Sequence, residues 1–411
     1  LKVVVSKLRS QTEFSNIDLE YTNLLLQAMS NFKAEPEFTE ILNKNYEQIK
    51  DHFRLKELFT NVFREIRYLG ISDTANLALQ HFNKANDFYW SQEFLKALSA
   101  YTKVLEINSK YIEAYIGRAQ TKFQMKDFKG GMADFQLAIQ IDPKNHLVFH
   151  ERALLKMNSL NDPGGALKDF DQAILLKPYW HSYMQRGNLK RALKDIQGAL
   201  DDFSEAIKLN PFHEWGYNQR GNVEFELKQF NEAIEDYSKA ILLQSNYVDA
   251  FLNRGNAKRA LGQKYEALAD YEKAVEFGCR NHFLFLASGA IRLEIDDLER
   301  AFLDYNYAIY LAEDKLSWQF YLSIGSQFFE KKKLNEAITI LQQGVQKYKN
   351  SELKNPLATV LMERMFQLYK KQKYDLAKED FVSFQKYATE SHPNWQDAHK
   401  LAKQIETLLK K

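Results

Sequence analysis

Arginine and aspartate recur along the middle of this 411-residue chain at a spacing that could bring opposite charges together. The arginines return every 34 residues, and an aspartate follows each of them 16 or 17 residues later. Such a series can act as a stripe of cations that binds phosphate groups, or as a row of internal ion pairs. The arginines are Arg118, Arg152, Arg186, Arg220 and Arg254, and the aspartates are Asp134, Asp169, Asp202, Asp236 and Asp270.

His146 and His150 have a spacing typical of metal ligands, because histidines four residues apart lie on one face of a helix. A third ligand is not evident in the nearby sequence, so we interpret both as polar groove or surface side chains. The sequence also lacks a phosphate-binding loop, a dinucleotide-binding glycine pattern and the local signatures of a Ser-His-Asp triad. We therefore expect no catalytic residue, no metal site and no cofactor.

The composition argues against several classes of partner and compartment. Charged residues make up 27% of the chain, but the formal net charge is only +2, so no overall field favours nucleic acid or acidic membranes. No window approaches the roughly 18 consecutive apolar residues of a membrane-spanning helix. The single Cys279 rules out an internal disulfide and fits a reducing compartment. We expect a cytoplasmic protein, with a processed N-terminus and another compartment as the alternative.

A repeat of small residues and rings indicates the elements that carry these side chains. Small and apolar residues three and four apart form one helix face, and small residues on two antiparallel helices let the backbones approach closely. The chain has only 7 Pro and 16 Gly, which favours long helices joined by short turns. The small residues are Ala85, Ala119, Ala153, Gly187, Gly221, Gly255, Gly289 and Gly325, and the rings or large apolar groups are Tyr101, Phe135, Phe170, Phe203, Tyr237, Tyr271, Tyr305 and Leu341.

This order of glycine or alanine, then alanine, tyrosine or phenylalanine, alanine and proline resembles the tetratricopeptide repeat (TPR). The resemblance covers roughly residues 74–350 as eight repeats. It implies an all-α protein, a right-handed α-solenoid of helical hairpins in which each repeat packs against its neighbours.

The chain is expected to have three parts. Residues 1–72 lack the period and read as an N-terminal helical region, either a cap or diverged repeats. Residues 73–350 form the eight repeats. Residues 351–411 contain a degenerate ninth hairpin, from about Pro356 to Ala388, and then an amphipathic capping helix.

Within each hairpin, the recurring arginine and aspartate lie at nearly the same distance from the turn that joins the two helices. We therefore predict an ion pair between the two helices of each repeat that carries both residues. The seventh repeat is an exception, because Ser288 stands opposite Asp304. An exposed ion pair contributes about 0.2 to 1 kcal/mol, so we interpret the series as fixing register more than as a large stabiliser.

The resemblance also implies that the first helix of each repeat lines a concave groove. Side-chain amides can donate to and accept from an extended peptide backbone, and rings can form pockets for its side chains. Alternatively, asparagine beside glycine is common filler in such repeats. The implied groove residues are the amides Asn86, Asn188, Asn218, Asn222, Asn253 and Asn256, the apolar Met184, Trp215 and Phe225, and the cations Arg191 and Arg259.

We expect a non-enzymatic scaffold that binds an extended peptide segment of a protein partner along repeats four to six. Binding to chaperone tails, known in the family, is not expected, because Phe82, Met184 and Asn218 stand where the first lysine of the clamp would be. RNA-binding repeats need a basic groove, and the inward cations are few. A fixed structural subunit of a larger assembly, using its convex face or termini, is the alternative, and the oligomeric state stays open.

Overall fold

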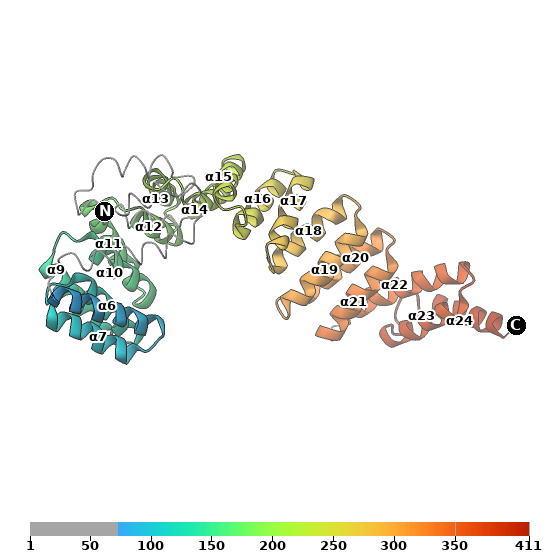
Figure 1. Ribbon diagram of the computed structural model, residues 1–411. Helices are drawn as coiled ribbons and strands as arrows, with labels where there is room; N and C mark the ends of the chain where they lie inside the picture. The colour runs from blue at the N-terminus through green and yellow to red at the C-terminus, as the bar shows by residue number, and fades with distance from the viewer. Residues whose placement is uncertain (1–72, 350, 411) are drawn as a thin grey trace, which may run out of the picture. The chain divides into compact units, whose positions relative to one another are not determined.

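The computed structural model describes residues 73–349 and 351–410, which form nineteen helices and contain no β-strand. Consecutive helices pair into hairpins, which confirms the all-α repeat architecture expected from the sequence (Figure 1). The helical region expected at residues 1–72 lies outside the described residues. The chain divides into two compact units, Leu1–Ser182 and Tyr183–Lys411.

The first unit contains repeats one to three, each made of two helices joined by three residues. Small residues such as Ala85 and Ala119 are buried together with the rings of Tyr101 and Phe135. The helices are α6 (Asp73–Trp90) and α7 (Phe94–Ile107), α8 (Ile112–Gln124) and α9 (Phe128–Ile141), and α10 (His146–Ser159) and α11 (Pro163–Leu176).

The second unit contains repeats four to nine and a final helix. The first helix of repeat four begins at Trp180 and crosses the boundary between the two units, which lies between Ser182 and Tyr183. None of the described helices is both long and apolar enough to cross a lipid bilayer. The helices are α12 (Trp180–Ala192) and α13 (Ile196–Leu209), α14 (Glu214–Glu226) and α15 (Phe230–Leu243), α16 (Val248–Ala260) and α17 (Lys264–Glu276), α18 (His282–Glu294) and α19 (Leu298–Ala312), α20 (Trp318–Glu330) and α21 (Leu334–Tyr348), α22 (Ser351–Lys370) and α23 (Tyr374–Tyr387), and α24 (Trp395–Leu409).

The ninth hairpin begins earlier than its sequence indicates. Helix α22 starts at Ser351, so Pro356 lies inside the helix and the expected start at this proline was wrong. Leu353 is fully buried and packs closely against Gly344 of α21, which extends the helix in front of the proline. Helix α24 packs against α22 and α23, and its Ile405 is fully buried.

The same type of turn joins the two helices within a repeat, as repeat five shows. The Gln229 N–H donates to the Glu224 carbonyl at 2.8 Å, and the Lys228 N–H donates to the Phe225 carbonyl at 3.0 Å. These bonds satisfy the last carbonyls of α14 before α15 begins. Lys228 has a left-handed φ of 60°, a conformation that Gly262 provides in repeat six. The short turn fixes which residues of the two helices face each other.

Glycine in the first helix allows the ring of the second helix to lie directly against its backbone. A Cβ atom at Gly221 would lie 2.9 Å from Cε1 of Tyr237, and one at Gly255 would lie 2.6 Å from Cε1 of Tyr271. Both tyrosines are almost completely buried. The recurring glycine is therefore a consequence of close helix approach, as the sequence pattern predicts.

Candidate functional site

The recurring arginines and aspartates form ion pairs within the hairpins of both units. In repeat five, Arg220 Nε lies 2.6 Å from Asp236 Oδ2, and Arg220 Nη2 lies 2.8 Å from Asp236 Oδ1. This two-bond geometry matches the planar fork of a guanidinium to a carboxylate. The same arrangement joins Arg118 to Asp134, Arg152 to Asp169, Arg186 to Asp202, and Arg254 to Asp270.

These pairs are buried, unlike the exposed pairs assumed from the sequence. The aspartate side chains of the five pairs are only 2 to 9% exposed. Each guanidinium also lies 5.4 to 5.9 Å from the centre of the aromatic ring three residues earlier. Losing one partner of such a pair leaves a buried charge and costs about 3 to 5 kcal/mol, although the net contribution of the intact pair can still be small.

Sequence reasoning missed other members of this series. In repeat nine, Arg364 Nε lies 2.8 Å from Asp380 Oδ2, with the same spacing of 16 residues. In repeat seven, Arg292 Nη1 lies 2.5 Å from Asp304 Oδ2, although Ser288 occupies the usual arginine position. The sequence did contain a signal for Arg292, because it stands four residues after Ser288. In four other repeats a lysine stands four residues after the arginine and is a second cation for the aspartate. The lysines Lys122, Lys156, Lys190 and Lys258 lie 2.7 to 3.0 Å from the aspartates of their repeats.

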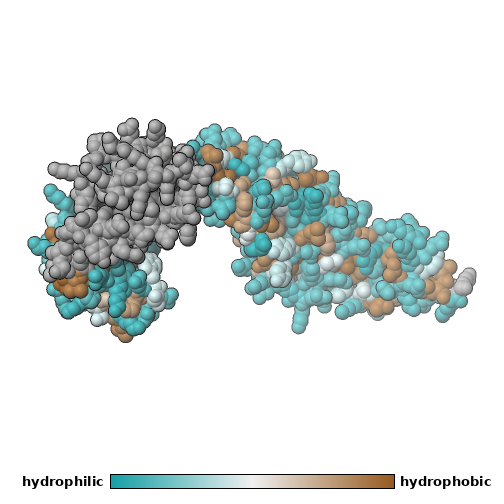
Figure 2. Space-filling view, viewed as in Figure 1, coloured by the Kyte–Doolittle hydropathy of each residue, from teal (hydrophilic) through white to brown (hydrophobic). Residues whose placement is uncertain are grey.

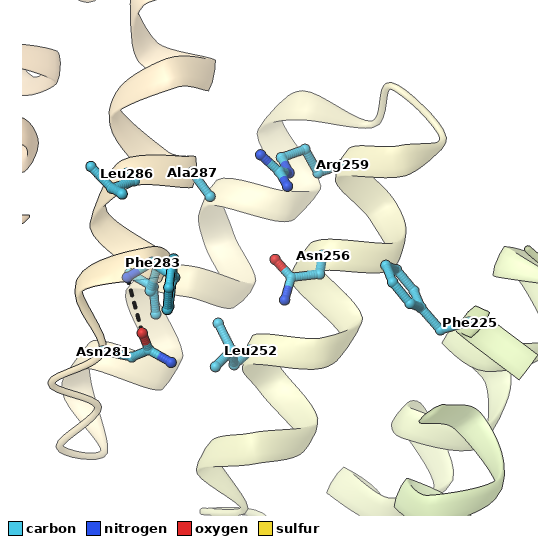
Figure 3. A pocket seen from close by; sticks show the side chains of 9 residues that line it. Phe225, Leu252, Asn256, Arg259, Asn281, Phe283, Leu286 and Ala287 are labelled. Atoms are coloured by element: carbon cyan, nitrogen blue, oxygen red, sulfur yellow. Dashed lines mark hydrogen bonds between the residues drawn. The ribbon is translucent and has the colours of Figure 1, made fainter. Parts of the chain in front are cut away.

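A cavity of about 430 Å³ opens between the first helices of repeats five, six and seven (Figure 3). Its walls are mostly apolar, and its polar groups come chiefly from α16. The lining residues are Phe225 of α14, Leu252, Asn256 and Arg259 of α16, and Asn281, Phe283, Leu284, Leu286 and Ala287 at the start of α18.

Phe283 provides the most exposed apolar surface of this cavity, with 66% of the residue accessible. Asn281 caps α18 by accepting a hydrogen bond from the Phe283 N–H at 2.9 Å, drawn as a dashed line in Figure 3. The cap holds the first turn of α18 and so positions the phenylalanine. A ring this exposed on an ordered helix is a candidate contact for a partner.

Asn256 lies between Phe225 and Phe283 in this cavity (Figure 3). The Tyr271 hydroxyl donates to Asn256 Oδ1 at 2.8 Å. Burial raises the pKa of Tyr271 to about 12, so the hydroxyl keeps its proton and can donate. This bond occupies the amide oxygen, while the amide nitrogen has no hydrogen-bond partner among the described residues. Asn256 is thus oriented to donate into the cavity.

The two predicted groove cations have different surroundings. Arg191 Nη2 lies 2.6 Å from Glu226 Oε1, and its Nε lies 2.9 Å from the same oxygen. Arg259 is exposed and forms no ion pair within the described part of the chain. Arg259 is therefore the groove cation available to a ligand carboxylate.

Two of the predicted groove residues belong to the core. Met184 is fully buried, and its sulfur lies close to Gly216 of the next repeat. Asn218 is 4% exposed and accepts a hydrogen bond from Asn253 Nδ2 at 3.2 Å. The predictions that Met184 and Asn218 face the groove were wrong, because these positions point toward the neighbouring helix.

The other asparagines of repeats four to six form a network instead of a row of free amides. Gln219 Nε2 donates to Asn188 Oδ1 at 2.8 Å, and Asn222 Nδ2 donates to Gln219 Oε1 at 2.9 Å. Asn222 Oδ1 accepts from both Tyr237 at 2.9 Å and Asn253 at 3.0 Å. Asn222 is therefore already satisfied, and the network ties together the first helices of consecutive repeats.

The two remaining predicted groove residues, Asn86 and Trp215, are not among the residues that line this cavity. Asn86 belongs to the first unit and accepts a hydrogen bond from the Tyr101 hydroxyl at 2.5 Å. This is the same asparagine–tyrosine contact as in repeats five and six, so it explains part of the asparagine pattern. Trp215 is half-buried at the start of α14.

Both histidines of repeat three pack against neighbouring side chains of the fold. His150 is 5% exposed, and its Nδ1 lies 2.9 Å from Ser182 Oγ, so the expected groove or surface position was wrong for this residue. Burial lowers the pKa of His150 to about 3, which keeps the ring neutral. The half-buried His146 packs against the ring of Tyr179. No group of three or more potential metal ligands occurs in the described residues.

Family models match the chain at several of these repeats. The model described as tetratricopeptide repeat matches residues 112–145, 181–213 and 248–277. A second model, described as TPR repeat, matches residues 221–262. No curated protein matches the chain closely enough to count as a relative.

Solved structures with a similar fold include the TPR protein YrrB, described as having an unusual peptide-binding site. It is 23% identical, with 44% of this chain and 93% of that chain covered and a TM-score of 0.39. A tetratricopeptide repeat protein from Parabacteroides merdae is 18% identical over 58% and 94% of the two chains, with a TM-score of 0.42. PilF of Pseudomonas aeruginosa is 18% identical over 49% and 90%, with a TM-score of 0.43.

Proposed function

The chain belongs to the tetratricopeptide repeat family, and from this premise we propose that it binds an extended segment of a partner protein in the cavity of repeats five to seven. Folds of this kind serve as protein-interaction scaffolds. The observation that carries the proposal is the cavity between α14, α16 and α18, where apolar walls meet a donating amide and an unpaired guanidinium. The site lies one repeat further along the chain than the repeats four to six expected from the asparagine pattern.

The apolar walls favour one large apolar side chain of the partner. Phe283, Leu252 and Leu286 surround a space that is open to such a side chain. Burial of apolar surface contributes about 25 cal/mol per Å², so one anchor residue can supply much of the affinity. Polar residues cover most of the visible face of the second unit, and apolar ones form small separate groups (Figure 2). A local anchor fits this surface better than a broad apolar interface does.

The polar groups of α16 favour a carboxylate close to that anchor. Asn256 and Arg259 are three residues apart and so lie on the same face of the helix. The amide nitrogen of Asn256 can donate to a backbone carbonyl, and Arg259 can pair with an acidic side chain or a C-terminal carboxylate. An extended chain rises about 3.3 Å per residue, so both contacts can be made within about two residues of the anchor. We propose a segment with one large apolar residue followed closely by a carboxylate.

The proposal assigns no catalytic step and no cofactor to the chain. Nucleic acid is a poorer partner, because Glu226 already neutralises Arg191 and a phosphate backbone needs several free cations. We place the protein in a reducing compartment such as the cytoplasm, on the basis of its single, buried cysteine.

The test is a comparison of proteins captured by the full chain and by a variant with Asn256→Ala, Arg259→Ala and Phe283→Ala. A genuine partner is retained by the parent and lost from the variant, and a synthetic peptide from it should compete for binding. A partner retained equally by both would exclude this cavity. The exposed Leu303, Tyr307 and Tyr310 on α19 would then mark the alternative, a structural subunit that is bound through the outer face of its second helices.

A further inference from the structure

The arginines of repeats two, five and six share a set of contacts, which repeat six illustrates. Arg254 donates to both carboxylate oxygens of Asp270 and lies 5.5 Å from the ring centre of Phe251. Its Nη1 also donates to Ser238 Oγ, on the second helix of the preceding repeat, at 2.9 Å. A carboxylate, an aromatic face and a hydroxyl oxygen of the preceding helix surround the guanidinium in this way in repeats two, five and six.

Repeat seven keeps the surroundings, but Ser288 occupies the usual arginine position, and Arg292, one turn later, pairs with the aspartate and lines the cavity. Ser288 stands 34 residues after Arg254, and its short side chain leaves a cavity of about 170 Å³. The cavity is lined by Asp304 and by Phe285, the counterparts of Asp270 and Phe251. Glu272 of the preceding helix takes the place of Ser238 and adds a second carboxylate.

The charges around this cavity differ from those of the complete repeats. Asp270 of repeat six pairs with two cations, Arg254 and Lys258. In repeat seven Arg292 is shared, with Nη1 2.5 Å from Asp304 Oδ2 and Nη2 2.9 Å from Glu272 Oε1. Two carboxylates thus face one guanidinium, and burial raises the pKa of Asp304. With both carboxylates ionised, Asp304, Glu272 and Arg292 sum to one negative charge, which one more cation would neutralise.

We propose that this pocket between α17, α18 and α19 binds a guanidinium group supplied from outside the chain. Beside Arg292, a planar guanidinium can stack on the ring of Phe285 and donate to Asp304 and Glu272, much as Arg254 stacks on Phe251 and donates to Asp270 and Ser238. The group can belong to a free arginine-like molecule or to an arginyl side chain of a protein. The pocket shares only Leu284 with the lining of the larger cavity, so it is independent of the proposed peptide site.

The experiment is an NMR titration of the full chain labelled at Ile, Leu and Val methyl groups. The probe is N-acetyl-L-arginine N-methylamide, and the matched control is the citrulline compound, which has the same shape without the charge. The methyl signals of Val275, which lines this pocket and not the larger cavity, should shift saturably with the arginine probe. Binding of the citrulline compound should be at least tenfold weaker. Equal shifts with both probes, or none with either, would overturn the proposal.

Two variants locate the site within the pocket. Ser288→Arg supplies the guanidinium from within the chain, so it should abolish probe binding. Glu272→Gln changes a side chain that is 62% exposed, so the fold should persist while the affinity falls about tenfold. Unchanged affinity in either variant would contradict the proposal. If Ser288→Arg does not fold, Glu272→Gln decides.

An engineered pocket in repeat five controls for the sensitivity of the titration. Arg220→Ser removes the internal guanidinium beside Asp236, and Ile207, which stands two repeats before Val275 at the equivalent position, serves as reporter. Arginine binding at Ile207 in this variant, together with no shift at Val275 in the parent, would show that the assay works and that repeat seven is not a site. Free L-arginine binding more tightly than the blocked probe would identify a small molecule as the source. Equal or weaker binding of free arginine would identify a protein side chain.

Discussion

Arg364 Nε lies 2.8 Å from Asp380 Oδ2 in the ninth repeat, although Met365 replaces the alanine or glycine that follows the arginine in complete repeats. Asp380 is only 3% exposed. The position four residues after Arg364 is Leu368 instead of a lysine. The ion pair therefore persists where the rest of the repeat pattern has degenerated, and its energy can be measured without a second cation.

Removing Arg364 alone should strongly destabilise the ninth repeat. We expect Arg364→Met to lower the free energy of unfolding by about 3 to 5 kcal/mol, because the buried carboxylate of Asp380 loses its partner. The double variant with Asp380→Leu should recover more than about 1 kcal/mol of this loss, since no buried charge remains. Urea denaturation followed by circular dichroism measures both values. Additive effects of the two single substitutions would show that the pair is not coupled.

Glu224 occupies the lysine position of repeat five and should make the protein less stable as the pH rises. Its side chain is 13% exposed, and burial together with the nearby Asp236 raises its pKa to about 7. The folded state favours the protonated carboxyl group. The contribution of Glu224 to the free energy of unfolding is therefore complete below the unfolded pKa of about 4.3 and is lost as the pH rises through 7. Glu224→Gln should therefore be about 2 kcal/mol more stable than the parent at pH 8.

The stability difference between Glu224→Gln and the parent should shrink as the pH falls from 8 to 5. Chemical denaturation at each pH measures it, and other titrating groups cancel in the comparison. Glu235→Gln, on the exposed face of α15, is the matched control. A gain in stability of Glu224→Gln that is the same at pH 5 and pH 8 would refute the linkage to this carboxyl group.

Close approach of the two helices makes Gly255 intolerant of even a methyl group. The added Cβ would lie 2.6 Å from Cε1 of Tyr271, so Gly255→Ala should cost about 1 to 3 kcal/mol by overpacking. Gly164 of α11 has no neighbouring atom within 4 Å of an added Cβ, so Gly164→Ala should keep or raise the stability by up to about 1 kcal/mol. Thermal melts of the two variants give the comparison. Similar melting temperatures would contradict the proposed packing.

The sequence predicts contacts within a repeat well, because the turn length and the helix period fix which residues of the two helices meet. The spacing between Arg220 and Asp236 is sufficient to predict their ion pair. Side-chain direction is harder to predict, because it depends on neighbouring repeats. Met184 points inward and packs close to Gly216 of the next first helix, a contact between repeats. Neither cavity could be predicted, since each requires side chains from three helices.

The affinity of a partner peptide for the full chain tests the central claim most directly. The peptide is the segment that a captured partner contributes, and its dissociation constant is measured by calorimetry. We expect Asn256→Ala with Arg259→Ala to weaken binding by at least tenfold, because a neutral hydrogen bond and a charged one are lost. Tyr310→Ser, on the exposed face of α19, should leave the dissociation constant within about twofold of the parent. Equal affinity of the parent and the Asn256 and Arg259 double variant would contradict the account.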